Sequence, residues 1–132
     1  MALAYPPFKS CPCGSGRSYA HCCGPLHAGG RAATPEALMR SRYSAYALGN
    51  ARYVLDTWHP DTRPATLDLR DGTRYLGLRV RGAAGPFVEF TAQLRLPGGE
   101  RYALRENSEF VQLEGRWVYL DGVTADADPD AG

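Results

Sequence analysis

The residues of this sequence with the clearest capacity for chemistry are its four cysteines, which all lie within residues 11–23. Their spacing is Cys-x-Cys, eight residues, then Cys-Cys, at Cys11, Cys13, Cys22 and Cys23. Four thiolates in one short segment form the donor set that tetrahedral zinc prefers, with Zn–S bonds of about 2.3 Å. We therefore expect a structural Zn²⁺ site, because four protein ligands leave no open position for water or substrate.

Two other uses of the cysteines are open. A disulfide framework is disfavoured, because adjacent Cys22 and Cys23 bond to each other only with strain and residues 1–10 lack the pattern of a secretory segment. Thiol exchange at the Cys-x-Cys step is disfavoured as well, because thiolates held by zinc are poor nucleophiles. Nearby, Gly14, Gly16 and Gly24 suit sharp turns with positive φ.

Charge and packing around the cysteines fit the same interpretation. A zinc ion with four thiolates carries a formal charge of about −2, which Lys9, Arg17 and His21 are placed to offset. Tyr19 is expected to pack over the site as a small lid.

The segment from Cys11 to Gly24, Cys-Pro-Cys-Gly-Ser-Gly-Arg-Ser-Tyr-Ala-His-Cys-Cys-Gly, resembles the SEC-C motif. This motif is the zinc knuckle at the C-terminal end of the preprotein translocase motor SecA. Its fourth ligand is usually histidine, whereas this chain has Cys23. The resemblance implies that all four cysteines are ligands. By analogy with the contact of the SecA tail with its chaperone, it also implies a partner protein bound through the knuckle.

Further motifs resemble the YchJ family of bacterial proteins, the UPF0225 group, over residues 10–122. These motifs are Ala37-Leu-Met-Arg-Ser-Arg-Tyr-Ser-Ala-Tyr46, Thr57-Trp-His-Pro60, Arg63-Pro64 and Gly115-Arg-Trp-Val-Tyr-Leu-Asp-Gly122. The resemblance implies a zinc knuckle followed by a domain of the NTF2-like fold, a cone of helices packed on a curved sheet. It implies no established reaction.

Length and composition bound the remaining possibilities. A chain of 132 residues with 44% hydrophobic residues suits one globular domain with a small appendage. It contains no run of eighteen apolar residues, so we expect no membrane span and a cytoplasmic protein. A formal charge of +1 offers no long-range field for nucleic acid. We expect a knuckle at 1–26, a connector at 27–33, the α+β domain at 34–123 and a disordered acidic tail at 124–132.

Two helices are predicted at the start of the domain. Thr34 reads as an N-cap, Pro35 as the first helical residue and Gly49 as the residue that closes the helix. A shorter helix is capped by Asn50 and ends before Pro60.

From residue 73 the apolar period changes to two, which predicts antiparallel strands. Leu76, Leu78 and Val80 alternate with polar or small residues, and a second alternating run covers 88–96. A third strand covers 102–113, and Glu114-Gly115 reads as a two-residue hairpin turn into residues 116–121. Helices followed by strands in series give the α+β class, in agreement with the NTF2-like cone that the resemblance implies.

Polar residues interrupt the expected core face in two places. Arg42 lies at the edge of the helix stripe formed by Met39, Tyr43 and Tyr46. We favour an aliphatic stem that covers the core with a guanidinium that reaches water; the alternative places Arg42 at the mouth of a pocket.

On the third strand, Glu106 and Ser108 share a face with apolar side chains. We favour an internal salt bridge from Glu106 to Arg42 or Arg40 over a ligand pocket. On the last strand Trp117, Tyr119 and Asp121 are expected to share one face. The candidate pocket residues are Arg42, Tyr46, Trp58, Glu106, Ser108, Trp117 and Tyr119.

Two classes of function follow. In the first, a zinc-stabilised module binds a partner protein through the knuckle or a small ligand in the cone. In the second, the cone is an enzyme of the isomerase or dehydratase type, with Glu106, His59 and Tyr46 as acid–base candidates. We favour the first, because the sequence lacks the Asp/His dyads of known cone enzymes and His59 suits a structural role at a helix end.

Overall fold

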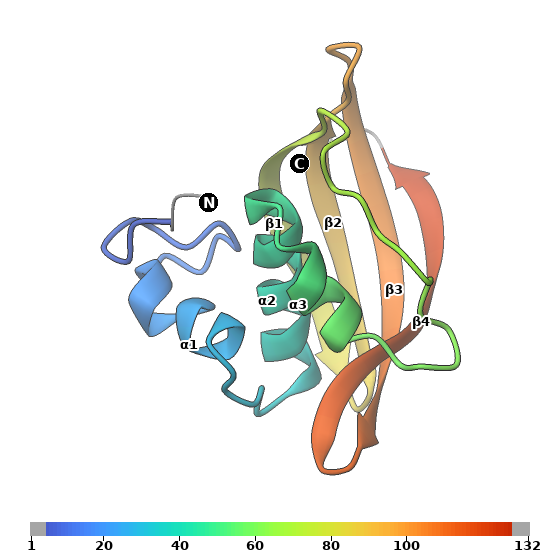
Figure 1. Ribbon diagram of the computed structural model, residues 1–132. Helices are drawn as coiled ribbons and strands as arrows, with labels where there is room; N and C mark the ends of the chain where they lie inside the picture. Colours follow the sequence, from blue (N-terminus) through green and yellow to red (C-terminus); the bar gives the residue numbers. More distant parts are fainter. Residues whose placement is uncertain (1–4, 128–132) are drawn as a thin grey trace.

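Three layers follow one another in the computed structural model, which describes residues 5–127 (Figure 1). The N-terminal segment forms the first layer, two helices the second and a four-stranded sheet the third. The elements in chain order are the 3₁₀ turn η1 (Tyr19–His21), α1 (Gly24–His27), α2 (Pro35–Leu48), α3 (Ala51–Asp56), β1 (Arg74–Ala84), β2 (Phe87–Arg95), β3 (Arg101–Leu113) and β4 (Arg116–Ala127). This architecture is the α+β class that the sequence predicts.

Helix α2 has the ends that the sequence predicts. The side-chain oxygen of Thr34 accepts the backbone N–H of Ala37 at 3.1 Å, which satisfies one of the free donors of the first turn. Gly49 ends the helix with φ of 73°, a left-handed conformation that glycine adopts without steric cost. These two ends fix the length of the helix that contacts both other layers.

Helix α3 is shorter than predicted. Asn50 caps it through a hydrogen bond from Tyr53 N–H at 3.1 Å, and the helix ends at Asp56. The chain then turns toward the sheet, where Trp58 forms a parallel bridge with Tyr119 of β4. The end of α3 is thereby tied to the last strand.

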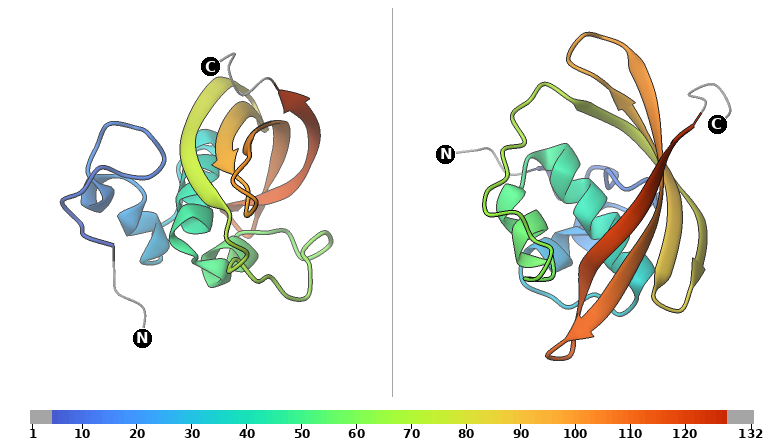
Figure 2. Two further views of the ribbon diagram at one scale, coloured as in Figure 1. Left: turned by 90° about the horizontal axis from the view of Figure 1, so that it is seen from above. Right: turned by 90° about the vertical axis from the view of Figure 1, so that its right-hand side faces the viewer.

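The sheet is an antiparallel meander with the strand order β1-β2-β3-β4, and it curves around the helices (Figure 2). Glu114 and Gly115 both have positive φ, 52° and 79°, which is typical of the tight turn that joins two hairpin strands. The predicted hairpin between the last two strands is therefore confirmed.

Two of the three register shifts in the sheet change predicted side-chain positions. In β1 the pairing skips Leu76, whose side chain is 48% exposed, so the neighbouring Tyr75 faces the cone instead. In β4 the pairing skips Leu120, because Phe110 pairs with Tyr119 while Glu109 pairs with Asp121. An extra residue in one strand reverses the alternation beyond it. The predictions that Leu76 faces inward and that Asp121 shares a face with Tyr119 are therefore wrong.

The last strand is longer than predicted. It pairs with β3 as far as Ala127, opposite Ala103. The predicted boundary at 123 is therefore wrong, because residues 124–127 belong to the sheet. The rest of the predicted tail, 128–132, lies outside the described residues, as do residues 1–4.

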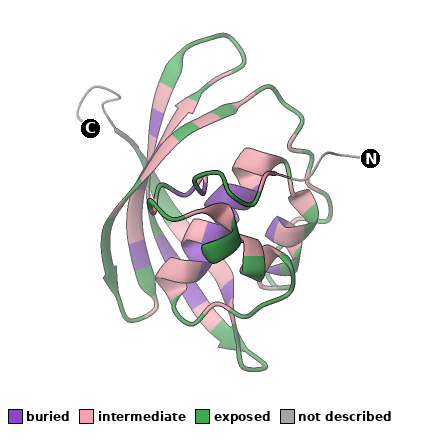
Figure 3. Cartoon of the chain, turned by 90° about the vertical axis from the view of Figure 1, so that its left-hand side faces the viewer, coloured by how far each residue is buried: buried purple, intermediate pink, exposed green. Residues whose placement is uncertain are grey.

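A buried apolar cluster lies where α2 meets the sheet (Figure 3). Leu38 and Met39 of α2 contact Val88 of β2 and Phe110 of β3, and all four side chains are buried. Within residues 5–127 no helix is long and apolar enough to span a lipid bilayer.

Candidate metal centre and cone cavity

The four cysteines form one compact cluster. Their sulfur atoms all lie within 4.8 Å of one another, and none is in a disulfide. Cys11, Cys13 and Cys23 are buried, whereas Cys22 is partly exposed. Four sulfur donors at this spacing could hold a metal ion.

The thiols influence one another strongly. Hydrogen bonds from the thiols of Cys13 and Cys23 lower the pKa of Cys11. The same contacts with Cys11 raise the pKa of Cys13 and of Cys23. Among these three thiols the protein's own groups thus favour the thiolate form only at Cys11, and a cation is the kind of group that stabilises further thiolates.

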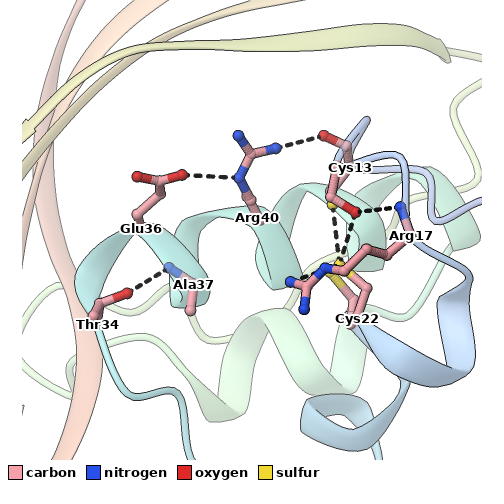
Figure 4. Close-up of polar contacts among 9 residues, drawn as sticks. Cys13, Arg17, Cys22, Thr34, Glu36, Ala37 and Arg40 are labelled. Atoms are coloured by element: carbon pink, nitrogen blue, oxygen red, sulfur yellow. Dashed lines mark hydrogen bonds and ion pairs between the residues drawn. The ribbon is translucent and has the colours of Figure 1, made fainter.

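Polar groups of the knuckle lie beside Cys22 (Figure 4). The Ser15 hydroxyl lies 3.1 Å from the Cys22 sulfur, and the Arg17 guanidinium donates to it at 3.8 Å. Gly14 and Gly16 have φ of 77° and 86°, as predicted. The cationic Arg17 therefore lies where it offsets thiolate charge.

Gly24 differs from its prediction. It begins helix α1 and does not have positive φ. A Cβ atom at this position would lie 2.7 Å from the carbonyl oxygen of Tyr19. Close packing of the Tyr19 backbone, and not an unusual turn, is therefore the reason for glycine here. The Tyr19 ring packs against the cysteine cluster, as the sequence suggested.

Helix α2 supplies the opposite wall of the cysteine cluster. The Ser44 hydroxyl donates to the Cys23 sulfur at 3.4 Å and lies 3.4 Å from the Cys11 sulfur. The guanidinium of Arg40 donates to the backbone oxygen of Cys13 at 3.0 Å (Figure 4). The cluster is thereby fixed to the first helix of the cone.

His27 is a second link between the knuckle and α2, and the sequence analysis assigned it only to the connector. Its Nε2 lies 2.7 Å from the carbonyl oxygen of Ser41, so Nε2 must carry the proton and donate. Its Nδ1 then accepts the Tyr19 hydroxyl at 2.6 Å. The ring lies between Tyr19 and Tyr53, and burial lowers its pKa. A neutral His27 therefore holds the two layers together.

A cavity of about 320 Å³ lies inside the cone, between α2 and the sheet. Six of the seven pocket candidates line it, namely Arg42, Tyr46, Trp58, Glu106, Ser108 and Tyr119. Most of the other lining side chains are aromatic or aliphatic: Met39, Tyr43, Tyr75, Phe90, Ala92, Leu94, Leu104 and Phe110. Tyr75 was missed because the register shift at Leu76 turns it inward.

Arg42 is buried, with 6% of its surface exposed, so the prediction that its guanidinium reaches water is wrong. Its Nη1 donates to the Val54 carbonyl and to the Thr57 hydroxyl, both at 2.7 Å. The guanidinium carbon also lies 5.1 Å from the centre of the Trp58 ring and 4.7 Å from that of Tyr119. Two aromatic faces and two oxygens thus stabilise the charge inside the cone.

Glu106 finds partners other than the predicted arginines. Its Oε2 accepts hydrogen bonds from the hydroxyl of Ser108 and, at 3.1 Å, from that of Tyr119. Arg40 instead pairs with Glu36 at 3.1 Å. No ion pair joins Glu106 to Arg42 within the part of the chain that the structure describes. The predicted internal salt bridge is therefore wrong.

Two further candidates lie away from the cavity. Trp117 packs at the edge of the apolar cluster and lines a separate hollow. The Nδ1 atom of His59 accepts the backbone N–H of Asp61 at 3.0 Å. The backbone N–H of His59 donates to the Tyr119 carbonyl at 2.7 Å. His59 therefore contacts the loop that follows it and β4, and the three acid–base candidates are not brought together.

The tyrosines of the cavity are held in their neutral form. Burial raises the pKa of Tyr43 and of Tyr75 to about 12, and it also raises that of Tyr46 and of Tyr119. At neutral pH these phenols are hydrogen-bond donors rather than bases.

Two family models match the chain. The model of the YchJ middle NTF2-like domain matches residues 34–122, and that of the SEC-C motif matches residues 9–25. A UPF0225 protein of Deinococcus radiodurans is 66% identical over 118 residues, which cover 89% of this chain and 91% of that protein. This chain belongs to the UPF0225 (YchJ) family.

Other relatives extend the likeness. A UPF0225 protein of Xanthomonas campestris is 48% identical over 122 residues, covering 87% of this chain and 95% of that protein. The solution structure of a SEC-C motif containing protein from Rhodopseudomonas palustris is 41% identical, with a TM-score of 0.76 and coverage of 88% and 98% of the two chains. A crystal structure of a SEC-C motif containing protein from Psychrobacter arcticus is 27% identical, with a TM-score of 0.68 and coverage of 87% and 82%.

The first prediction concerns His27. Replacing His27 with Gln should lower the free energy of unfolding by about 1–3 kcal/mol at pH 7.5, because the ring contacts with Tyr19 and Tyr53 and one of the two hydrogen bonds are lost. Since the folded pKa is depressed, the unfolded state binds more protons below pH 6.5, and the stabilisation by His27 is lost as pH falls. Urea unfolding of both proteins at pH 7.5 and 5.5 measures this difference.

Both proteins are unfolded at the same metal concentration. Any effect of acid on the cysteine thiols is then common to both and cancels in the difference between their unfolding free energies. The gap in unfolding free energy between the wild type and His27→Gln should narrow at pH 5.5. A gap that stays constant would contradict the neutral, buried state of this ring.

The second prediction concerns the space that the Glu106 side chain occupies. A Cβ atom on Gly122 would lie 2.7 Å from the Glu106 Cδ, so Gly122→Ala must displace the carboxyl group from Ser108 and Tyr119. We expect a loss of about 1–2 kcal/mol in chemical unfolding. Gly82→Ala in β1 is the matched control, because a Cβ there meets nothing within 4 Å. Equal effects of the two substitutions would contradict this packing.

Proposed function

We propose that this protein binds a small ligand in the cavity of its cone, and that a structural zinc ion holds the helix that shapes the cavity. The observation that carries the proposal is the division of α2 into two faces. Arg40, Ser41 and Ser44 contact the knuckle. The cavity-lining residues of the helix are Met39, Arg42, Tyr43 and Tyr46, of which Tyr43 also packs against the cysteine cluster. With about 100° per residue, the centres of these two sets lie nearly opposite on the helix.

The donor set supports zinc as the metal. Sulfurs in a tetrahedron at about 2.3 Å from zinc lie about 3.8 Å apart. The sulfurs of Cys13 and Cys22 are 3.5 Å apart, and those of Cys22 and Cys23 are 3.9 Å apart. Four soft thiolates select zinc over oxygen-seeking cations such as Mg²⁺. Cys11, Cys13, Cys22 and Cys23 would hold the ion, which would supply stability to a segment with few apolar side chains.

The lining of the cavity supports a small ligand. A volume of about 320 Å³ with mostly apolar walls and a few polar groups at fixed positions is typical of small-molecule sites. A binding role fits better than acid–base catalysis. Of the three acid–base candidates only Glu106 and Tyr46 line the cavity, Tyr46 is a neutral phenol, and His59 lies elsewhere.

A partner protein bound through the knuckle stays a prediction. The buried cysteines face α2, so a partner would contact the opposite side of the knuckle. Phe8 of the knuckle is 81% exposed and would be an apolar anchor for such a contact.

The third prediction tests the metal. Elemental analysis of protein purified under reducing conditions should find one zinc per chain. Cys13→Ser should lose most of this zinc and unfold at a lower urea concentration, because a site with three sulfurs binds zinc more weakly. Ser10→Ala, an exposed position in the same segment, is the control and should keep the metal. The absence of stoichiometric zinc from the wild type would overturn this part of the proposal.

The fourth prediction uses the two tryptophans of the chain. Trp58 lines the cavity, whereas Trp117 does not. Titration of ¹⁵N-labelled protein with a library of small aromatic and aliphatic fragments should shift the indole N–H signal of Trp58 and leave that of Trp117 in place. Trp58→Phe and Trp117→Phe assign the two signals. If every fragment leaves the Trp58 signal unchanged, the cone does not bind small molecules and the ligand proposal fails.

A further inference from the structure

Arg42 is a charged side chain inside the cone with most of its donors unused. A charged residue with only 6% of its surface exposed is rare unless it is paired. Of the five N–H donors of a guanidinium, those on Nη1 donate to Val54 and Thr57. Among residues 5–127 no acceptor contacts Nε or Nη2, and no carboxylate forms an ion pair with the group. Within the described residues, the cavity therefore contains a cation with no carboxylate in ion-pair contact.

Glu106 contributes the second polar group of the same cavity. Its Oε2 accepts the hydroxyls of Ser108 and Tyr119, whereas Oε1 accepts from no described side chain. Because Arg42 of α2 and Glu106 of β3 form no ion pair, they are two separate polar groups in a mostly apolar cavity. A ligand that satisfies both must offer an acceptor to Arg42 and a donor to Glu106.

The shape of the guanidinium specifies the acceptor. Its Nε–H and one Nη2–H point in parallel, and this pair matches the two oxygens of a carboxylate. A phosphate dianion is disfavoured, because the carboxylate of Glu106 lines the same space of about 320 Å³. The aromatic and aliphatic walls require an apolar body between the two ends of the ligand.

We propose that the cone binds a small organic acid with an apolar or aromatic body, whose carboxylate pairs with Nε and Nη2 of Arg42 and whose hydroxyl or amino group donates to Oε1 of Glu106. This inference rests on the proposed function, because it names the ligand class of the same cavity. It adds that the ligand is an anion and that it carries a donor at its far end.

The test uses three related probes with wild-type protein at pH 7.5. The probe 4-hydroxyphenylacetate has both groups, 4-hydroxyphenylacetamide lacks the charge, and phenylacetate lacks the donor. We expect the acid to bind at least about tenfold more tightly than the amide, the size of one charge-assisted hydrogen bond. It should also bind about threefold or more tightly than phenylacetate. The shift of the Trp58 indole signal gives each dissociation constant.

A variant pair then assigns the effect to Arg42. Arg42→Gln should remove the preference for the acid over the amide and leave the affinity for the amide within about twofold. Arg52→Gln is the matched control, because Arg52 is 92% exposed on α3. If Arg42→Gln does not fold, the comparison of acid with amide in the wild type still decides the question.

The outcomes separate the two proposals. If the amide binds as tightly as the acid, the anion inference is overturned while the cone remains a ligand site. If no probe and no fragment shifts the Trp58 signal, the proposed function itself fails. Equal losses of acid affinity in Arg42→Gln and Arg52→Gln would also overturn the role of Arg42.

Discussion

The position of helix α2 is the constraint on which both sites depend. On one face Ser44 and Arg40 contact the cysteine loop, and the Ser41 carbonyl accepts from His27. On the other face the helix lies against the sheet and lines the cavity. Because one helix makes both sets of contacts, a shift of α2 at the sulfurs would also move the cavity wall. The metal centre would thus act on the cavity by holding this helix, without touching a ligand.

Charge burial sets the character of the cavity. Removing an arginine from water costs several kcal/mol, and the two hydrogen bonds and two aromatic faces around Arg42 offset part of that cost. An apolar residue of similar volume would make a more stable core. Glu106 is only half-buried, and its hydroxyl partners satisfy one of its two oxygens. A charge buried at such a cost, beside a carboxylate in the same cavity, is typical of a site that has a partner outside the protein chain.

The parts predicted from sequence are those set by local rules. Thr34 and Gly49 define α2 through capping, and the period of two defines the strands. The inward position of Tyr75 depends on an extra residue in β1, which alternation cannot reveal because the apolar pattern around Leu76 looks regular. The burial of Arg42 depends on oxygens of α3 that lie twelve or more positions away in sequence. Long-range packing of this kind leaves no periodic signal.

In the proposed function the specificity of this protein lies in the cone. Four sulfur ligands would leave a zinc ion without a position for substrate, and three of those sulfurs are buried. A relative with 27% identity keeps this fold with a TM-score of 0.68, but a shared fold does not fix a ligand. What a cone of this kind recognises depends on the few polar side chains in its wall. Here they are Arg42 from the helix held by the cysteines, and Glu106 with its partners from β3 and β4. The knuckle therefore helps to fix the position of Arg42 through its contacts with α2, and the sheet supplies Glu106 on the other side of the cavity.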